Sequence, residues 1–100
     1  MPLDNTTQMI GKLNYETGEF TYNICDEIDG GLDFYAPQTL VTPDKRRIMI
    51  AWMQSWERNI PSEKFGFAGM MTVPRELTVK NDKLIQNPVH EIEDYRSNKV

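Results

Sequence analysis

The stretch that decides the fold runs from Gly30 to Leu77 and reads GGLDFYAPQTLVTPDKRRIMIAWMQSWERNIPSEKFGFAGMMTVPREL. Within it, three unusual clusters follow one another: DFYAPQ at 33–38, IAWMQSW at 50–56 and AGMMTVPREL at 68–77. Short apolar and aromatic runs separated by Pro, Gly and Asp are typical of strands joined by turns. This stretch therefore predicts antiparallel β-structure.

Two strands are expected in the first half of this stretch. The first covers 34–41, where Pro37 must lie at an edge, a bulge or a strand start because proline cannot donate to a β-ladder. TPDK at 42–45 has the signature of a type I turn. The mostly apolar run 47–53 then indicates a strand buried on both faces.

Further strands are expected on both sides of these two. Upstream, two short strands flank the turn NYETG and form a hairpin. Downstream, Asn81 and Asp82 make the turn of a second hairpin, and Pro88 precedes a short helix with helical apolar spacing. The expected outer strands are 9–13, 19–23, 69–74, 76–80 and 83–86, and the expected helix covers 89–96.

The sum is an all-β chain of six or seven short strands with one terminal helix, a pattern typical of a sandwich, a barrel or a propeller. Propeller blades have four strands each, so about one and a half to two blades fit. The expected organisation is a frayed N-terminus at 1–8, a partial β-propeller at 9–88 and a C-terminal helix or linker at 89–100.

Length and charge restrict the classes of function. One hundred residues allow one domain or part of one, and a net charge of −4 disfavours nucleic acid and anionic membranes as partners, because phosphates would be repelled. No apolar run is long enough to span a membrane, and the N-terminus lacks a signal-peptide pattern. We therefore expect neither a nucleic-acid nor a membrane partner.

Cysteine and histidine are too few for most metal or thiol chemistry. Cys25 is the single cysteine, so no disulfide can form within the chain, and a lone thiol suits a cytoplasmic location. His90 is the single histidine and lies far from Cys25 in sequence. We expect Cys25 to be an inert, buried or half-buried thiol, and we expect no metal and no cofactor.

The order DFYA, WMQSW and PREL resembles glycoside hydrolase family 32, which contains invertases, sucrose-6-phosphate hydrolases and fructan hydrolases. The similarity runs from about Met9 to Arg96 and includes the YETGEF turn and the phrase PVHEIEDYR. It implies a fragment of a five-bladed β-propeller, specifically its C-terminal blades, the fourth and fifth. It also implies a parent enzyme that hydrolyses β-fructofuranosides with retention.

The same resemblance implies three substrate-binding residues. Asp33 would lie near the central funnel and orient a sugar hydroxyl, Tyr35 would line the sugar pocket, and Trp56 would form part of the aromatic wall around the fructosyl ring. Each has a structural alternative. Asp33 could accept backbone N–H bonds in the glycine loop, Tyr35 could be a core residue, and Trp56 could be a plug between blades.

Other residues of the three clusters have expected structural roles. Trp52 is expected in the core of a blade, and Arg75 and Glu76 are expected to have separate structural partners, because neighbours on a strand point to opposite faces. Phe67 stands where family members commonly carry tryptophan, so the indole N–H donor is missing there.

The family's catalytic carboxylates are not found in this sequence. Retaining glycoside hydrolysis needs two carboxyl groups about 5–5.5 Å apart, but the NDPN, RDP and EC motifs that carry them in the family do not occur. We therefore assign no catalytic residue and expect the chain by itself to be inactive. The alternatives are a non-catalytic carbohydrate-binding module and a structural module that self-associates through exposed strand edges.

Overall fold

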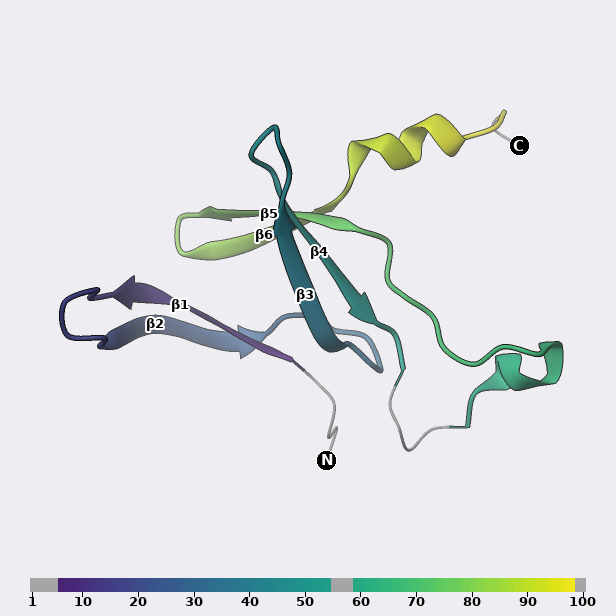
Figure 1. The fold of residues 1–100 in the computed structure, drawn as a ribbon, viewed down its shortest axis with the longest axis horizontal. Helices are drawn as coiled ribbons and strands as arrows, with labels where there is room; N and C mark the ends of the chain where they lie inside the picture. Colours follow the sequence, from purple (N-terminus) through teal and green to yellow (C-terminus); the bar gives the residue numbers. More distant parts are fainter. Residues whose placement is uncertain (1–5, 55–58, 99–100) are drawn as a thin grey trace.

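Antiparallel strands make up nearly all regular structure in the computed structural model, which describes residues 6–54 and 59–98. A two-stranded sheet pairs β1 with β2, and a four-stranded sheet has the order β3-β4-β5-β6 (Figure 1). The all-β expectation is confirmed. The elements are β1 Thr7–Leu13, β2 Phe20–Glu27, β3 Tyr35–Val41, β4 Arg47–Trp52, η1 Pro61–Phe65, β5 Arg75–Lys80, β6 Lys83–Pro88 and η2 His90–Tyr95.

The β3–β4 pair contains an irregularity at the expected proline. The antiparallel register shifts between Tyr35 and Gln38, and Ala36 has a positive φ of 49°. β3 is an edge strand of its sheet, so the N–H group that Pro37 lacks does not interrupt a ladder between inner strands. The prediction of an edge or bulge position for Pro37 is therefore confirmed.

The β5–β6 hairpin closes through the expected two-residue turn. Asn81 and Asp82 have φ values of 52° and 58°, and Lys80 pairs with Lys83 across them. Positive φ at both central residues matches the right-handed twist of the two strands. Asn and Asp tolerate this conformation better than most residues, which is why the sequence located this hairpin correctly.

The segment before β5 differs from the expected strand at 69–74. It makes one isolated bridge, between Trp52 and Met71, and otherwise has irregular backbone. Gly69 has a φ of 107°, which turns the chain away from a regular ladder. Thr72 still returns to β4, since its N–H donates to Ala51 O at 2.8 Å and its Oγ1 accepts the Ala51 N–H at 3.1 Å.

The core is small and lies on one face of the four-stranded sheet. Phe34, Met49 and Ala51 are buried, and Ile28 and Leu77 pack against them. The radius of gyration is 16.7 Å, whereas a compact chain of this length has about 13 Å. Many large apolar side chains are consequently exposed.

The two terminal regions show how this open shape departs from the sequence expectations. β1 begins at Thr7, inside the stretch expected to be frayed, and η2 is a 3-10 helix over His90–Tyr95 where a short helix was expected.

Cys25 is exposed, so the prediction of a buried or half-buried thiol is wrong. It pairs with Met9 on a face of the two-stranded sheet where Met9 is itself exposed.

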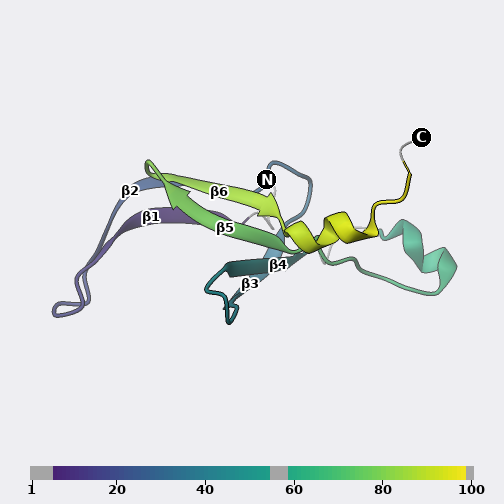
Figure 2. The same ribbon diagram turned by 90° about the horizontal axis from the view of Figure 1, so that it is seen from above.

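The β1–β2 hairpin lies beside the β5–β6 hairpin in both views (Figures 1 and 2). Side chains of both hairpins line a shallow hollow, with Ile10 and Ile24 on one side and Leu84 on the other. In contrast, η1 and the residues that directly follow it project away from the sheets (Figure 2). None of the helices in the described residues is long and apolar enough to cross a membrane.

Candidate functional site

The candidate site surrounds the loop that connects β2 to β3, residues 28–34, which we call the Asp29 loop. Two adjoining hollows of about 460 and 300 Å³ lie along it. Both are lined by Asp29, Met53, Thr72 and Arg75. Side chains from the loop, from the end of β4 and from β5 therefore meet at one place.

Asp33 lines the smaller of the two hollows, together with Asp29 and Leu32. Its side chain is half-buried, between the exposed Leu32 and the fully buried Phe34. The burial of Phe34 in the core fixes the end of the loop, and Asp33 precedes it directly in the chain. The structure thus places this predicted residue at a hollow surface.

Tyr35 begins β3 and faces Trp52 of β4. The two rings have centroids 6.2 Å apart at an angle of 56°, and the two residues are register partners. Among the described residues Tyr35 lines neither of the two hollows. Asp33 and Tyr35 are therefore neighbours at the start of β3, but they contribute to different surroundings.

Trp52 lies on the face of β4 opposite the small core. Met49 and Ala51 are buried, whereas Ile50 and Trp52 are half-buried. Trp52 Nε1 lies 3.1 Å from the point where a Cβ at Gly69 would stand, so a side chain at Gly69 would crowd the indole. Trp56, the third predicted substrate residue, lies outside the described residues.

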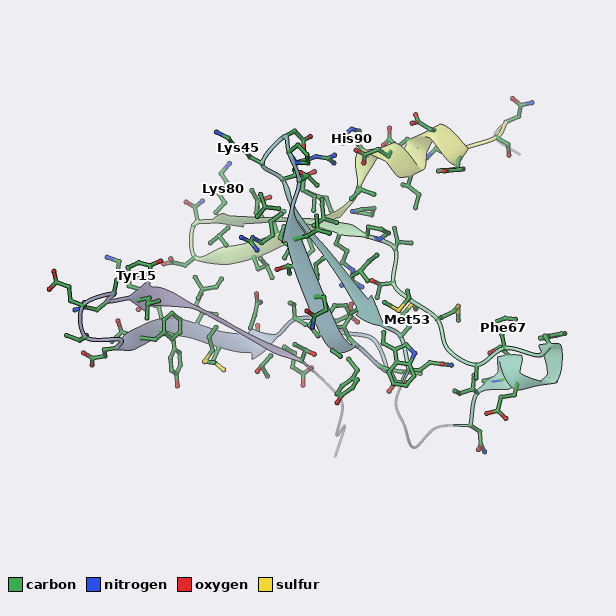
Figure 3. The ribbon with its side chains drawn as sticks, viewed as in Figure 1. Tyr15, Lys45, Met53, Phe67, Lys80 and His90 are labelled. Carbon is green, nitrogen blue, oxygen red and sulfur yellow. The ribbon has the colours of Figure 1, made fainter. Side chains whose placement is uncertain are left out.

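Phe67 and Met53 differ in their relation to the hollows. Met53 follows β4 at the edge of the hollows, whereas Phe67 is exposed on the projecting segment (Figure 3). Phe67, where the resemblance leads us to expect tryptophan, thus lines neither hollow.

Arg75 and Asp29 form the ion pair at the centre of the site. Arg75 Nη2 lies 2.8 Å from Asp29 Oδ2, and Arg75 Nη1 donates to Gln86 Oε1 at 2.9 Å. Glu76, the next residue, lies 3.8 Å from Arg46 instead. The prediction of separate partners for Arg75 and Glu76 is confirmed.

The ionisation of Asp29 follows from these contacts. Partial burial acts to raise the pKa of Asp29, but the Gly31 N–H bond and the Arg75 guanidinium outweigh it, so the pKa lies below its ordinary value of 3.8. A general acid for glycoside hydrolysis needs a raised pKa. Asp29 is consequently unsuited to that role in this structure.

Sequence reasoning missed Asp29 and Gln86 as site residues. Asp29 and Gln86 meet Arg75 only through the tertiary fold, and no local pattern marks them. Gln54, inside the WMQSW cluster, has a buried Oε1 without a hydrogen-bond partner among the described residues. Within residues 6–54 and 59–98, no group of three or more His, Cys, Asp or Glu is arranged to hold a metal ion.

Comparison with known proteins gives consistent matches. Residues 3–88 match the family model described as the glycosyl hydrolases family 32 N-terminal domain. A sucrose-6-phosphate hydrolase of Escherichia coli is 51% identical over 86 residues, which is 86% of this chain and 17% of that protein. The chain therefore spans about a sixth of the length of this curated relative.

Solved structures agree with the sequence matches. A Bombyx mori GH32 beta-fructofuranosidase superposes with a TM-score of 0.85 at 38% identity, covering 96% of this chain and 21% of that one. A variant of that enzyme has been solved in complex with sucrose. A sucrose-6-phosphate hydrolase from Lactobacillus gasseri has a TM-score of 0.80 at 29% identity, covering 90% of this chain and 19% of that one.

Proposed function

The chain belongs to glycoside hydrolase family 32, and we propose that it is a segment of a β-fructofuranosidase that acts on sucrose, sucrose 6-phosphate or fructans. In this proposal the segment supplies part of the sugar pocket through Asp33, Tyr35 and Trp56 and supplies no catalytic carboxylate. The observation that carries it is the position of Asp33, half-buried at the hollow beside the Asp29 loop.

The geometry supports a binding role for Asp33 and Tyr35. A carboxylate accepts hydrogen bonds from sugar hydroxyls, and a phenol can donate or accept one. Tyr35 packs on Trp52, so its ring is braced from one side. A carboxylate at a hollow and a braced aromatic ring two residues further along the chain would contact different parts of a neutral, hydroxyl-rich ligand such as a fructoside, because Tyr35 does not line the hollow of Asp33.

We further propose that the chain by itself does not hydrolyse fructosides. Retaining hydrolysis needs a nucleophile and an acid at one site, and Asp29, the other carboxylate at the hollow, is occupied by Arg75. Positioning groups without these two carboxylates leave the glycosidic bond intact.

The arrangement of strands supports a partial propeller. Four strands form the β3–β6 sheet and two form the β1–β2 sheet, which equals one blade and half of another at four strands per blade. We assign these to the last blades of a five-bladed propeller, with the C-terminal 3-10 helix leading out of it, and we place the parent enzyme in the cytoplasm.

A non-catalytic module is the second candidate function. Its support is the open architecture: β3 and β6 are edge strands, and most large apolar side chains are exposed. Edge strands with free backbone groups favour pairing with another chain. Such a module would self-associate through these edges or bind a carbohydrate without cleaving it. Sedimentation of a folded, strictly monomeric sample would count against self-association.

The proposed function is tested by two assays on the purified chain. Incubation with sucrose and with sucrose 6-phosphate is expected to release no sugar. Titration with fructose, followed by backbone NMR, is expected to shift the amides of Asp33 and Tyr35, whereas galactose is not. Asp33→Asn and Tyr35→Phe are expected to weaken the response to fructose.

Each assay has an outcome that contradicts the proposal. Hydrolysis that Asp33→Asn and Tyr35→Phe abolish would place the catalytic groups inside this chain. An equal response to fructose and galactose, or none to either in a folded sample, would remove the sugar pocket and leave the structural module.

A further inference from the structure

We propose that Arg75 is a positioning residue that holds the Asp29 loop in place and thereby sets the position of Asp33 in the sugar pocket. This inference rests on the proposed function, because it assigns a purpose to the loop that carries Asp33. Arg75 is distant from Asp33 in sequence, and it acts through Asp29 and Phe34 rather than on the sugar.

Arg75 contacts three partners at once. Its Nη2 pairs with Asp29 Oδ2 at 2.8 Å, its Nη1 donates to Gln86 Oε1 at 2.9 Å, and its guanidinium carbon lies 4.7 Å from the centroid of the Phe34 ring. Asp29 and Phe34 stand on either side of Asp33 in the chain. One planar cation therefore binds the loop before and after the proposed sugar contact.

Gln86 extends this clamp to the first residue of the loop. Its Nε2 donates to the backbone carbonyl of Ile28 at 2.7 Å, while its Oε1 accepts from Arg75. Because Gln86 lies on β6 and Arg75 on β5, the hairpin between them serves as a rigid base. The loop is thus attached to the sheet through side chains rather than through a β-ladder.

Inside the loop, Asp29 also fixes the backbone. Its Oδ1 accepts the Gly31 N–H at 2.8 Å, so one carboxylate binds both Arg75 and the turn at Gly31. At the far end, Thr6 Oγ1 donates to the carbonyl of Phe34 at 3.0 Å. Loss of Arg75 would leave the half-buried Asp29 carboxylate without its cation.

Arginine is required for this arrangement rather than any positive charge. The planar fork of guanidinium presents several donors in fixed directions and stacks on aromatic faces. A lysine ammonium could reach Asp29, but it lacks the fixed fork with which the Arg75 guanidinium lies over the Phe34 ring and also donates to Gln86. We therefore expect Arg75→Lys to retain only part of the clamp.

The first experiment measures loop order by amide hydrogen exchange in the 100-residue chain. Arg75→Met is expected to speed exchange at Gly31 by about tenfold or more. The Asp29 carboxylate accepts the Gly31 N–H, and it would lose the charged hydrogen bond to Arg75 that holds it in place. Exchange in the β3–β4 ladder should change far less, and Arg75→Lys should fall between.

Arg47→Met is the matched control. Arg47 is an exposed arginine on the adjacent strand β4, and its Nη1 donates to Thr39 Oγ1. Unchanged exchange at Gly31 in Arg75→Met would overturn the inference. A uniform increase across all strands would overturn it too, because that result describes loss of general stability.

The second experiment links the clamp to the sugar. In the fructose titration, Arg75→Met is expected to weaken the response at Asp33 severalfold, Arg75→Lys less, and Arg47→Met not at all. An undiminished response in Arg75→Met would overturn the positioning role. If the unsubstituted chain gives no response to fructose, the proposed function fails and the role toward the sugar fails with it, while the exchange experiment still decides whether Arg75 holds the loop.

Discussion

The guanidinium of Arg46 and the carboxylate of Glu91 form a two-armed ion pair that joins the β3–β4 turn to η2. Arg46 Nη2 lies 2.6 Å from Glu91 Oε1, and Nη1 lies 3.3 Å from Oε2. Arg46 Nε also contacts Asp44 at 2.8 Å. Lys45 at the turn and His90 at the start of η2 mark the two segments that this pair connects (Figure 3).

Removal of this cation should release η2. We expect Arg46→Met to speed amide exchange at Ile92 and Arg96, whose N–H groups form hydrogen bonds at the two ends of η2. The β5–β6 hairpin should keep its protection. Arg47→Met serves as the control, because Arg47 is the next residue, at the start of β4, and its side chain donates to Thr39 instead. Equal exchange at Ile92 in both variants would show that the ion pair does not hold the helix.

Acid should also release η2, because protonation of Glu91 removes its charge. The hydrogen bond from Arg46 is the main reason that the pKa of Glu91 lies below its ordinary value of 4.5. A carboxyl group with a lowered pKa stabilises the folded arrangement above that ordinary value, and the contribution disappears as the pH falls through the lowered pKa. Protection of the Arg96 amide against exchange should therefore persist from neutral pH to about 5 and decline below about 4. Glu91→Gln should remove the transition, and its persistence there would contradict this origin.

Gly11 is needed for the close approach of β1 and β2. A Cβ at this position would lie 2.1 Å from Thr21 O and 2.6 Å from Tyr22 Cα, both backbone atoms that cannot move aside alone. We expect Gly11→Ala to destabilise this hairpin by about 1–3 kcal/mol, as overpacking does elsewhere. Gly30→Ala is the control, because a Cβ there meets nothing within 4 Å. Urea unfolding with identical midpoints for the two variants would refute the expectation.

Thr72 ties the irregular segment before β5 to the core strand. Its hydroxyl accepts the buried Ala51 N–H at 3.1 Å. Thr72→Val keeps the shape but leaves that N–H unsatisfied, which should cost about 1–3 kcal/mol. Thr72→Ser keeps the hydroxyl and should cost less. A larger loss for Ser than for Val in thermal unfolding would mean that the methyl group, rather than the hydrogen bond, matters.

Several features of the fold were predictable because they depend on neighbouring residues. Pro37 had to interrupt a ladder or lie at its edge, and Asn81 with Asp82 favour the backbone angles of a two-residue hairpin turn. The order of the three clusters in 30–77 was enough to identify the family. Asp33 was proposed in the same way, by its place before Phe34 and Tyr35, and its role toward a sugar stays a prediction.

Other features required contacts that no local pattern encodes. The strand expected at 69–74 is absent as a regular element, because Gly69 adopts a positive φ. Cys25 is exposed because nothing in the described residues covers its face of the two-stranded sheet. Trp52 was expected in the core, yet the buried side chains of β4 are Met49 and Ala51 on its other face.

The sequence by itself therefore determined the β class, the turns and the family, since these follow from spacing, backbone restrictions and short motifs. Only the tertiary structure decided the ion pairs of Arg75 with Asp29 and of Arg46 with Glu91. These partners lie far apart in sequence, and their meeting depends on strand register and on the way one hairpin packs beside another. A charge in a sequence has many candidate partners, and the fold selects one by bringing its atoms within hydrogen-bonding distance.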